Sequence, residues 1–449
     1  MASVRDLSLY LQRRLGRWLA WLQGRCVQRI ANPQETPTLP ALDSLTQIVL
    51  GAAVGELAAG RTLGNRAMIW GAVAGTIPDF DVFAGQVADP ITNLAFHRCV
   101  THSLYYALLA SPVVAWITKA LYPIDGQPRL NYLWKVWLPG LVAITLLIAI
   151  GSFISPTPLR GVWAYSVVVA LATATFPFLV WGFRQIKQRK SVPYAPYQTW
   201  LLLFGLGIGT HPLLDCFTTY GTQLLQPFDD LRIAWNTISV VDPAYTLPFL
   251  TLLLVASRIL RTSIWRRRLT GLGLGLSSAY LIFTCINLMN VRKQVAADLA
   301  SANIRYERFV AVPTLFQNVL WSVTIDQGDT LKVGSLGLLD DPFKLSPKQL
   351  KTYPQNDYLL APIEEERAVE VIRWFSDGLY IVKKGSGDTL SIFDLRFGVL
   401  PVEGAQPIFG FELYPRQAFE EWGMRQVPFR KDTDMGEMFG ELWHRVKGN

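Results

Sequence analysis

Long apolar runs separated by short polar loops dominate the first 290 residues of this 449-residue chain. A helix needs about 20 apolar residues to cross a bilayer. The runs of that order are Leu104–Leu121, Leu133–Ile154, Val162–Phe183, Trp200–Phe217, Leu247–Leu260 and Leu269–Met289. Two shorter runs, Leu45–Gly60 and Met68–Phe83, are rich in glycine and alanine. The pattern predicts a polytopic α-helical membrane region with about seven or eight membrane helices, depending on whether Leu45–Gly60 is re-entrant or crosses fully.

The two short runs carry glycines four residues apart. Gly51 and Gly55 lie in the first run, and Gly71 and Gly75 lie in the second. Small residues at this spacing let two helices approach closely. We therefore interpret these glycines as packing positions.

From Arg305 onward the pattern changes to short β-branched and aromatic segments separated by turn-forming residues such as Gln327–Asp329 and Lys384–Asp388. We predict helical pieces near Pro347–Thr352 and Pro415–Trp422. Residues 291–449 should form a mainly β soluble domain, a small sandwich or barrel beside the membrane. The predicted strands are Phe309–Val312, Val319–Ile325, Thr330–Val333, Val369–Phe375, Gly378–Lys383, Thr389–Phe393 and Phe409–Leu413.

The first 42 residues form a third segment, an N-terminal extension before the membrane region at residues 43–290. Apolar residues recur in it at helical spacing with arginines between them, which predicts an amphipathic helix lying in the membrane interface. The apolar positions are Leu7, Leu11, Leu15, Trp18 and Leu22.

The distribution of charge supports this division. Only 17% of all residues are charged, yet residues 291–449 hold 22 of the 34 acidic and 19 of the 42 basic residues. That composition is ordinary for a soluble domain, and its slight acidity argues against nucleic-acid binding. The four cysteines are far apart, so neither a thiolate zinc site nor a disulfide framework is expected.

Basic residues in the membrane region fall mainly in alternate loops. One set of loops holds 14 lysines and arginines, including Arg258, Arg261 and Arg266, whereas the other set holds three. The positive-inside rule places the richer set in the cytoplasm. The soluble C-terminal domain is then expected on the extracytoplasmic side. Six arginines before residue 30 prefer the cytoplasm and favour seven spans, whereas placing Asp43 with the other acids favours eight.

Ionisable residues in the membrane region are rare, and many fall in three short clusters. Since a charge in the bilayer centre costs about 2.5–3.5 kcal/mol on insertion scales, such residues are functional candidates. Each cluster also has a structural interpretation: a turn or cap, a satisfied core histidine, or a His–Asp hydrogen bond. The clusters are Asp79 with Asp81, His97 with His102, and His211 with Asp215.

The predicted topology places all three clusters at one membrane face. We therefore expect one site, in which imidazoles and carboxylates without thiolates suit zinc, manganese or iron. The number of potential ligands allows one or two ions. A carboxylate that does not bind metal would serve as general base, and Asp81 and Asp215 are the predicted catalytic residues.

The ordered motifs of this chain resemble the YdjM-like family of bacterial membrane-bound metal-dependent hydrolases. They are Asp43–Gln47, Gly51–Glu56, Pro78–Asp81, His97–Ser103, His211–Asp215, Thr219–Thr222, Pro227–Phe228 and Asp242–Pro243, followed by Pro313, Asn318, Trp321, Arg373–Phe375 and Asp394–Gly398. The resemblance implies a location in the bacterial inner membrane. It also implies metal ligation by Asp79, Asp81, His97, His102, His211 and Asp215, with zinc as the expected ion.

Further residues of these motifs could be additional ligands or support the ligands. They are Asp43, Gln47, Glu56, Arg98, Thr101 and Asp242. The chain departs from the family pattern at Gln47, where the family often has histidine, and at Cys99, where it usually has glycine. We interpret Asp394 and Arg396 as an internal ion pair, and His444 as an exposed residue unrelated to the site.

The sequence leaves three kinds of function open. The first is a hydrolase in which metal-activated water attacks an ester or phosphoester; by analogy with helical zinc-dependent phospholipases C, its substrate would be lipid-like. The second is a non-catalytic metal-binding membrane protein. The third is an ion-coupled transporter. The bilayer is the one partner expected from the sequence, and protein partners stay unknown.

Overall fold

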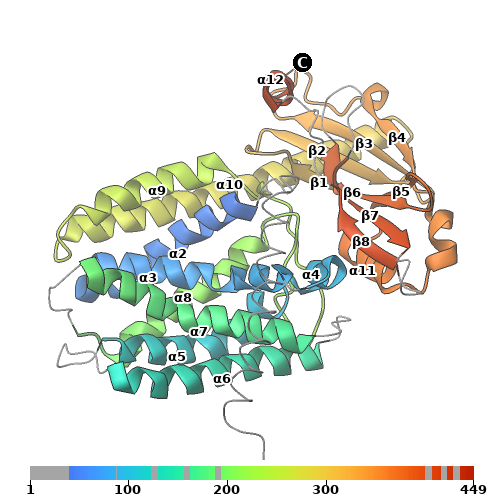
Figure 1. The fold of residues 1–449 in the computed structure, drawn as a ribbon. Coiled ribbons are helices and arrows are strands. Elements are labelled where there is room, and N and C mark those ends of the chain that lie inside the picture. Colours follow the sequence, from blue (N-terminus) through green and yellow to red (C-terminus); the bar gives the residue numbers. More distant parts are fainter. Residues whose placement is uncertain are drawn as a thin grey trace, which may run out of the picture. The chain divides into compact units, whose positions relative to one another are not determined.

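A computed structural model describes residues 40–86, 88–122, 130–155, 162–187, 194–399, 407–415, 422–427 and 435–448. Residues 43–449 form one compact unit. The amphipathic helix predicted near the N-terminus lies outside the described residues. Within the compact unit, a helical region precedes two β-sheets (Figure 1).

The eight predicted apolar runs lie mainly in helices, although the run Met68–Phe83 is divided between an α-helix that ends at Thr76 and a 3₁₀ segment that begins at Pro78. The helices are α2 (Pro40–Leu63), α3 (Asn65–Thr76), α4 (Pro90–Phe96), α5 (Leu104–Ala120), α6 (Leu130–Ile154), α7 (Val162–Lys187), α8 (Tyr197–Asp215), α9 (Pro243–Ser257) and α10 (Ile264–Ser301). Two short 3₁₀ segments, η1 (Pro78–Gln86) and η2 (Val100–His102), flank α4.

Two helices among the described residues are long and apolar enough to cross a membrane: Trp134–Ile154 within α6, and α10. The count rises to three if Pro90–His102 and Leu104–Ala120, which are bent by 64° at their junction, act as one span. Tyr165–Leu179 and Pro243–Ser257 are shorter apolar helices. The total of seven or eight spans therefore stays a prediction.

Glycines bring α2 and α3 into backbone contact. A Cβ atom added at Gly51 would lie 2.3 Å from the Gly71 carbonyl oxygen, and one at Gly75 would lie 2.5 Å from the Gln47 carbonyl oxygen. No side chain fits at such distances, which confirms the interpretation of these glycines as packing positions. The contact also sets Gly75 and Gln47 beside α8, where the candidate site lies.

A buried ion pair between Glu56 and Arg266 connects α2 to α10. Arg266 donates two hydrogen bonds to Glu56, at 2.6 and 2.5 Å, and a third to Asn65. Arg261 donates to the Thr62 carbonyl. These residues border the loop between α2 and α3 and the loop between α9 and α10. The charge pattern assigns both loops to the same membrane face.

The C-terminal part contains two four-stranded antiparallel sheets. The first has the order β1 (Arg308–Pro313), β2 (Leu320–Asp326), β3 (Thr330–Gly337) and β4 (Lys351–Pro354). The second has the order β5 (Tyr380–Lys384), β6 (Leu390–Val399), β7 (Pro407–Pro415) and β8 (Trp422–Gln426). Both predicted turns connect neighbouring strands, β2 to β3 and β5 to β6.

Alternation along the strands explains how the two sheets pack. In β2, Trp321, Val323 and Ile325 face the C-terminal half of α10. On the opposite face of this sheet, Leu331 and Val333 pack with β5 and β6 of the second sheet. The outer face of the second sheet is covered by α11 (Arg367–Ser376).

The predicted strand at Val369–Phe375 is wrong, because this segment lies in α11. Its β-branched and aromatic residues suit a strand locally. However, Ala368, Ile372 and Phe375 share one buried helix face, while Glu370 is exposed. Burial of that face against the second sheet and α4 overrides local propensity.

Other local differences are smaller. The predicted helical piece near Pro347–Thr352 is a 3₁₀ turn, η3 (Pro347–Gln349), followed by β4. The helical piece predicted at Pro415–Trp422 falls mainly outside the described residues. Helix α12 (Met435–Val446) was not predicted, and His444 in it is exposed as expected.

The helical region and the β sheets share a hydrophobic core. Ile91, Leu94 and Ala95 of α4 pack with α11 and the second sheet. Helix α10 runs without a break from the helical region to the first sheet (Figure 1). The division at residues 290 and 291 stays a prediction, since a single helix passes through it.

Candidate metal centre

Asp79 lies where α3 gives way to a 3₁₀ turn. Pro78 opens η1 directly after α3 and Ile77. Ile77 keeps helical dihedral angles, and Pro78, which has no N–H to donate, suits the first turn of the new segment. Asp79 Oδ1 lies 3.4 Å from Nε2 of both His102 and His211. At the start of η1 this carboxylate therefore meets two imidazoles from distant parts of the sequence.

His211 is held in one orientation by the backbone of α3. Its Nδ1 donates to the Gly75 carbonyl oxygen at 2.5 Å. A carbonyl can only accept, so the proton of this imidazole is on Nδ1, and Nε2 presents a lone pair to the site. The glycine contact between α2 and α3 places that carbonyl, which links helix packing to the tautomer of His211.

His102 is oriented by Asp81 and Thr101. Its Nδ1 lies 3.4 Å from Asp81 Oδ2 and 3.2 Å from Thr101 Oγ1, and its side chain is fully buried. A carboxylate at Nδ1 keeps the proton there and turns Nε2 toward Asp79 and His211. Asp81 is also held by the backbone N–H of Arg98, which donates to Oδ2 at 3.0 Å.

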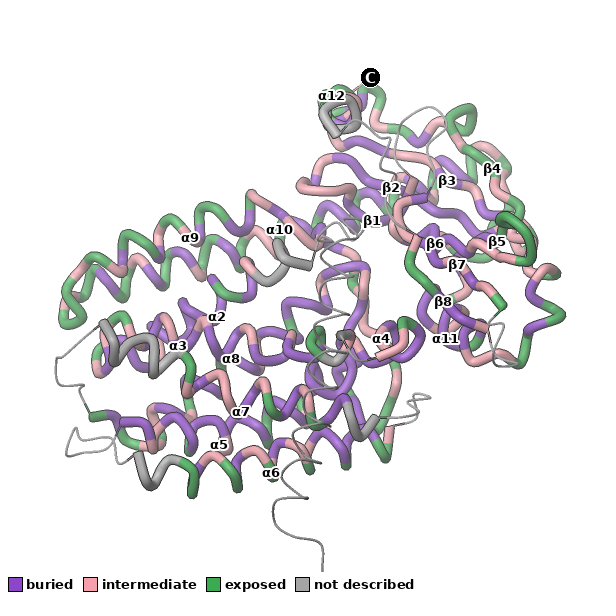
Figure 2. The backbone as a smooth tube through the Cα atoms, in the orientation of Figure 1, coloured by how far each residue is buried: buried purple, intermediate pink, exposed green. Residues whose placement is uncertain are grey.

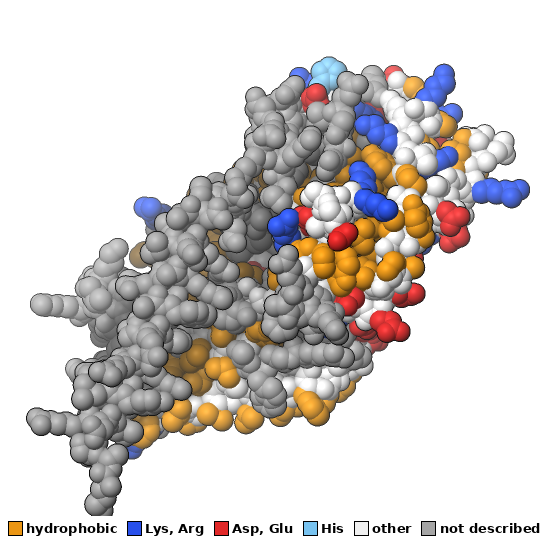
Figure 3. Space-filling model, turned by 45° about the vertical axis from the view of Figure 1, so that its right-hand side comes forward, with side chains coloured by type: hydrophobic (Ala, Val, Ile, Leu, Met, Phe, Trp, Pro, Cys, Tyr) orange, Lys and Arg blue, Asp and Glu red, His pale blue; other side chains and the backbone are white. Residues whose placement is uncertain are grey.

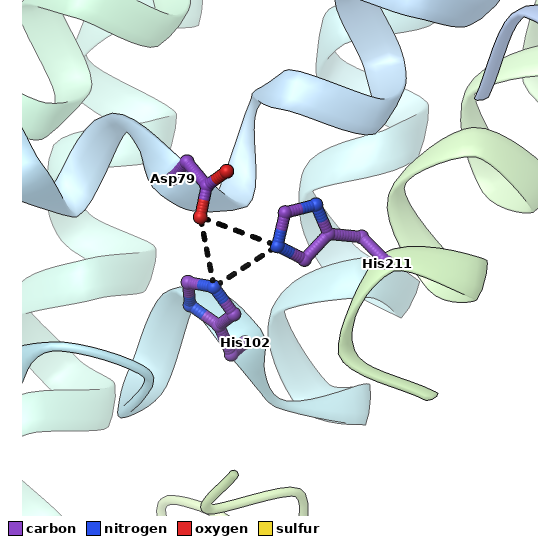
Figure 4. A group of neighbouring side chains, drawn as sticks. All are labelled: Asp79, His102 and His211. Carbon is purple, nitrogen blue, oxygen red and sulfur yellow. Dashed lines mark hydrogen bonds and ion pairs between the residues drawn. The ribbon is translucent and has the colours of Figure 1, made fainter. Parts of the chain in front are cut away.

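Three acceptor atoms thus converge without a donor between them (Figure 4). The Nε2 atoms of His102 and His211 are 3.1 Å apart, and each is 3.4 Å from Asp79 Oδ1. Ligands around a tetrahedral zinc ion with bonds of about 2.0–2.1 Å lie about 3.3–3.4 Å apart. The triangle therefore fits one face of a tetrahedral site, and these three residues could hold a metal ion.

Asp215 lies against the same triangle. Its Oδ2 is 3.4 Å from Nε2 of both histidines and 3.3 Å from Arg98 Nε. Gln47 donates to the other oxygen, Oδ1, at 2.8 Å. Gln47, where the family often has histidine, therefore contacts the site through Asp215.

His97 lies beside the triangle but is not part of it. Its Nδ1 is 3.1 Å from Asp81 Oδ1, and its ring packs 5.1 Å from the Tyr220 ring. Of the six predicted ligands, the structure brings together Asp79, His102 and His211, with Asp215 at their edge. Asp81 and His97 form an adjacent pair.

The remaining candidates lie elsewhere. Glu56 is paired with Arg266, as described above. Asp242 caps α9 by accepting from the Ala244 N–H at 2.9 Å, and its other oxygen accepts from Tyr280 at 2.8 Å. Asp43 lies in α2, and its side chain is outside the described set.

Sequence reasoning missed a cationic and aromatic group around Tyr220. The guanidinium carbons of Arg98 and Arg232 lie 5.1 and 5.0 Å from the Tyr220 ring. Arg232 also donates to the Phe375 carbonyl and lies 4.1 Å from the Phe375 ring in α11. Burial lowers the pKa of Arg232 to about 9, which leaves it charged at neutral pH. No local signal in the sequence marks Arg232, because its partners are distant along the chain.

Asp394 and Arg396 form the predicted ion pair, at 2.5 Å. Cys99 and Cys216 are free and buried, in agreement with a packing role.

Fold and site together define a helical membrane protein with a buried Asp–His group and a C-terminal β part. A family model described as YdjM inner membrane protein matches residues 42–291. The match covers more than half of the chain, and the chain belongs to this family of inner-membrane proteins, which confirms the resemblance. It includes every predicted site residue and ends before the C-terminal motifs. Searches of the curated proteins and of the solved structures found no significant match.

Proposed function

We propose that this protein is a membrane-embedded metal-dependent hydrolase that cleaves an ester or a phosphoester. The observation that carries the proposal is the buried convergence of Asp79 Oδ1, His102 Nε2 and His211 Nε2. Two imidazoles and one carboxylate with a fourth position open suit zinc in a catalytic site. A bound ion supplies the Lewis acidity that makes water nucleophilic near neutral pH. We propose one ion, held by these three residues.

The other residues have separate roles in this proposal. Asp81 is a positioning residue, because it contacts His102 and His97 through their Nδ1 atoms. Asp215 is the proposed general base, since its Oδ2 faces the triangle while Gln47 holds Oδ1. Arg98 stabilises negative charge that develops on the substrate.

Metal content and hydrolysis test the proposal separately. Full-length protein should retain about one zinc ion per chain after purification, and Asp215→Asn should keep it while hydrolysis of bis(p-nitrophenyl) phosphate falls by about 10²–10⁴-fold. The exposed Asp388→Asn is the matched control. Wild-type protein without bound transition metal would overturn the proposal of a metal-dependent hydrolase. Metal without hydrolysis would indicate a structural site, and ion-driven uptake in proteoliposomes would indicate a transporter.

We further propose that the sheets lie on the extracytoplasmic side, after seven or eight spans. The unequal number of basic residues in alternate loops supports this orientation. Alkaline phosphatase fused after Asn449 should be active and a green fluorescent protein fused there should be dark. The reverse pattern would invert the orientation without affecting the metal site.

A further inference from the structure

The candidate span in α6 ends close to the segment that carries His102. A Cβ atom at Gly151 would lie 2.8 Å from Val100 Cγ1 and 3.1 Å from the Tyr105 ring. The 3₁₀ segment that carries His102 therefore packs on α6 at Gly151. The span ends at Ile154, three residues further along, which is about 4.5 Å of helical rise.

Near the end of its apolar part, helix α10 is connected to the site by a chain of hydrogen bonds. Asn287 donates to Asn318 Oδ1 at 2.8 Å, and Asn318 donates to the Thr237 carbonyl at 2.7 Å. The Thr237 N–H in turn donates to the carbonyl of Phe217, two residues after Asp215. Asn287 lies five residues, or about 7.5 Å, before the exposed charged residue Arg292 that follows the apolar part of α10.

Exposed apolar side chains continue from the spans to the rim of the site. We define the apolar rim as Val82, Phe83, Leu104, Leu225 and Phe228, whose exposed fractions run from 42% to 78%. Val82 follows Asp81 directly, and the Leu104 N–H donates to the Leu224 carbonyl. The Phe228 ring lies 6.5 Å from the Tyr105 ring, which itself packs over Gly151.

Exposed apolar positions also occur along the helices. Leu108 in α5 is 73% exposed and Phe153 in α6 is 83% exposed. In Figure 3 hydrophobic side chains line the lower margin of the helical region, and in Figure 2 exposed positions recur along the outer sides of α6, α9 and α10. Such a surface is the one expected to face lipid.

Two arginines, Arg98 and Arg232, lie beside the site. Arg98 is paired with Asp215, but among the described residues no carboxylate lies within 4 Å of Arg232, which shares the Tyr220 ring with Arg98. Arginine favours phosphate through charge-assisted hydrogen bonds. A phosphate-bearing head group would balance this charge.

We infer that the metal centre lies at the head-group level of one leaflet and receives a phospholipid laterally, past the apolar rim. The part of this inference that concerns the substrate rests on the proposed function, whereas the part that concerns the location of the metal centre does not. The acyl chains stay in the leaflet beside Leu104 and Phe228, while the phosphoester reaches the triangle of Asp79, His102 and His211. Water is the second substrate of the hydrolysis, and the phosphoester bond is the one broken.

Depth-dependent quenching tests the location without reference to activity. Full-length protein with Cys26→Ser and Cys285→Ser would carry Phe228→Cys or Leu339→Cys, labelled with bimane in vesicles of phosphatidylethanolamine and phosphatidylglycerol. Cys99 and Cys216 are buried, and the parent without the new cysteine gives the background. The label at 228 should be quenched by lipids with a nitroxide near the head group, and the label at 339, in the turn after β3, by aqueous iodide. Iodide quenching alone at 228 would overturn the inference.

A hydrolysis assay then tests the substrate class. Phe228→Asp should lower hydrolysis of phosphatidylglycerol in the vesicles at least tenfold more than hydrolysis of bis(p-nitrophenyl) phosphate, whereas Leu339→Asp should change neither. Equal loss of both activities in Phe228→Asp would overturn lateral access. Wild-type protein that hydrolyses neither compound would overturn the proposed function, while the quenching result would still decide the location.

Discussion

The Nε2 atoms of His102 and His211 lie 3.1 Å apart, although each ring has an acceptor at its Nδ1 atom. Two neutral imidazoles in these tautomers present lone pairs to each other and to Asp79. Such an arrangement is repulsive unless a cation lies between the atoms. Either a metal ion or an added proton could supply the charge, and only a metal ion would be found by elemental analysis.

Replacing His211 and His97 in turn should show which of the two histidines binds the metal ion. We expect His211→Ala to abolish zinc binding, because it removes one corner of the triangle. His97→Ala should retain about one zinc ion per chain, since its Nδ1 atom contacts Asp81. Elemental analysis of the purified variants measures this directly. Loss of metal in both variants would restore His97 as a ligand.

Asp81→Asn should weaken metal binding without removing the site. The carboxylate orients His102 from behind, and loss of such a partner typically lowers metal affinity about 10–100-fold. At saturating zinc the stoichiometry should stay that of the wild type. Competition with a chromophoric chelator gives the affinity, with Asp388→Asn as the control. A variant that binds no zinc at any concentration would make Asp81 a ligand.

Gly71→Ala should destabilise the helical region. The added Cβ would lie 2.2 Å from the Gly51 carbonyl oxygen, so α2 and α3 would have to separate. We expect the free energy of unfolding to fall by about 1–3 kcal/mol. Gly205→Ala in α8 has no atom within 4 Å of its new Cβ and should cause no loss. Denaturant unfolding in detergent micelles compares the two, and equal stability would argue against the close helix contact.

The Glu56–Arg266 pair should show strong coupling. Removal of one partner leaves a buried charge and should cost about 3–5 kcal/mol. Glu56→Gln with Arg266→Met removes both charges and should be less destabilised than the sum of the single variants. A double-mutant cycle of unfolding free energies gives the interaction energy. Additive effects would show that the pair contributes little.

The sequence predicted the convergence of three clusters for a simple physical reason. Charged groups are costly in an apolar helical region, so the few that occur there are functional candidates. Successive loops alternate between the two membrane faces, and this alternation assigned His102, His211 and the motifs of Asp79 and Asp215 to the same face. Glu56 and Asp242 satisfy the same criterion but lie elsewhere, because an ion pair and a helix cap also stabilise a buried carboxylate. Residue type alone does not distinguish these outcomes.

Other features depended on tertiary contacts that no local pattern reports. The tautomer of His211 depends on the Gly75 carbonyl, which is placed by the contact between α2 and α3. The segment around Val369 has the composition of a strand and becomes α11 because the second sheet buries one of its faces. Arg232 contacts the rings of Tyr220 and Phe375, which are distant from each other in the sequence, so no local pattern marks it.

The uninterrupted helix α10 limits where residues can be inserted into the chain or deleted from it. One residue inserted between Leu288 and Val295 would rotate everything beyond it by about 100° and advance it by about 1.5 Å. The first sheet packs on that part of α10, so neither shift could be absorbed locally. Small insertions and deletions among relatives should therefore be excluded from this stretch and accumulate instead at exposed turns such as Lys384–Asp388.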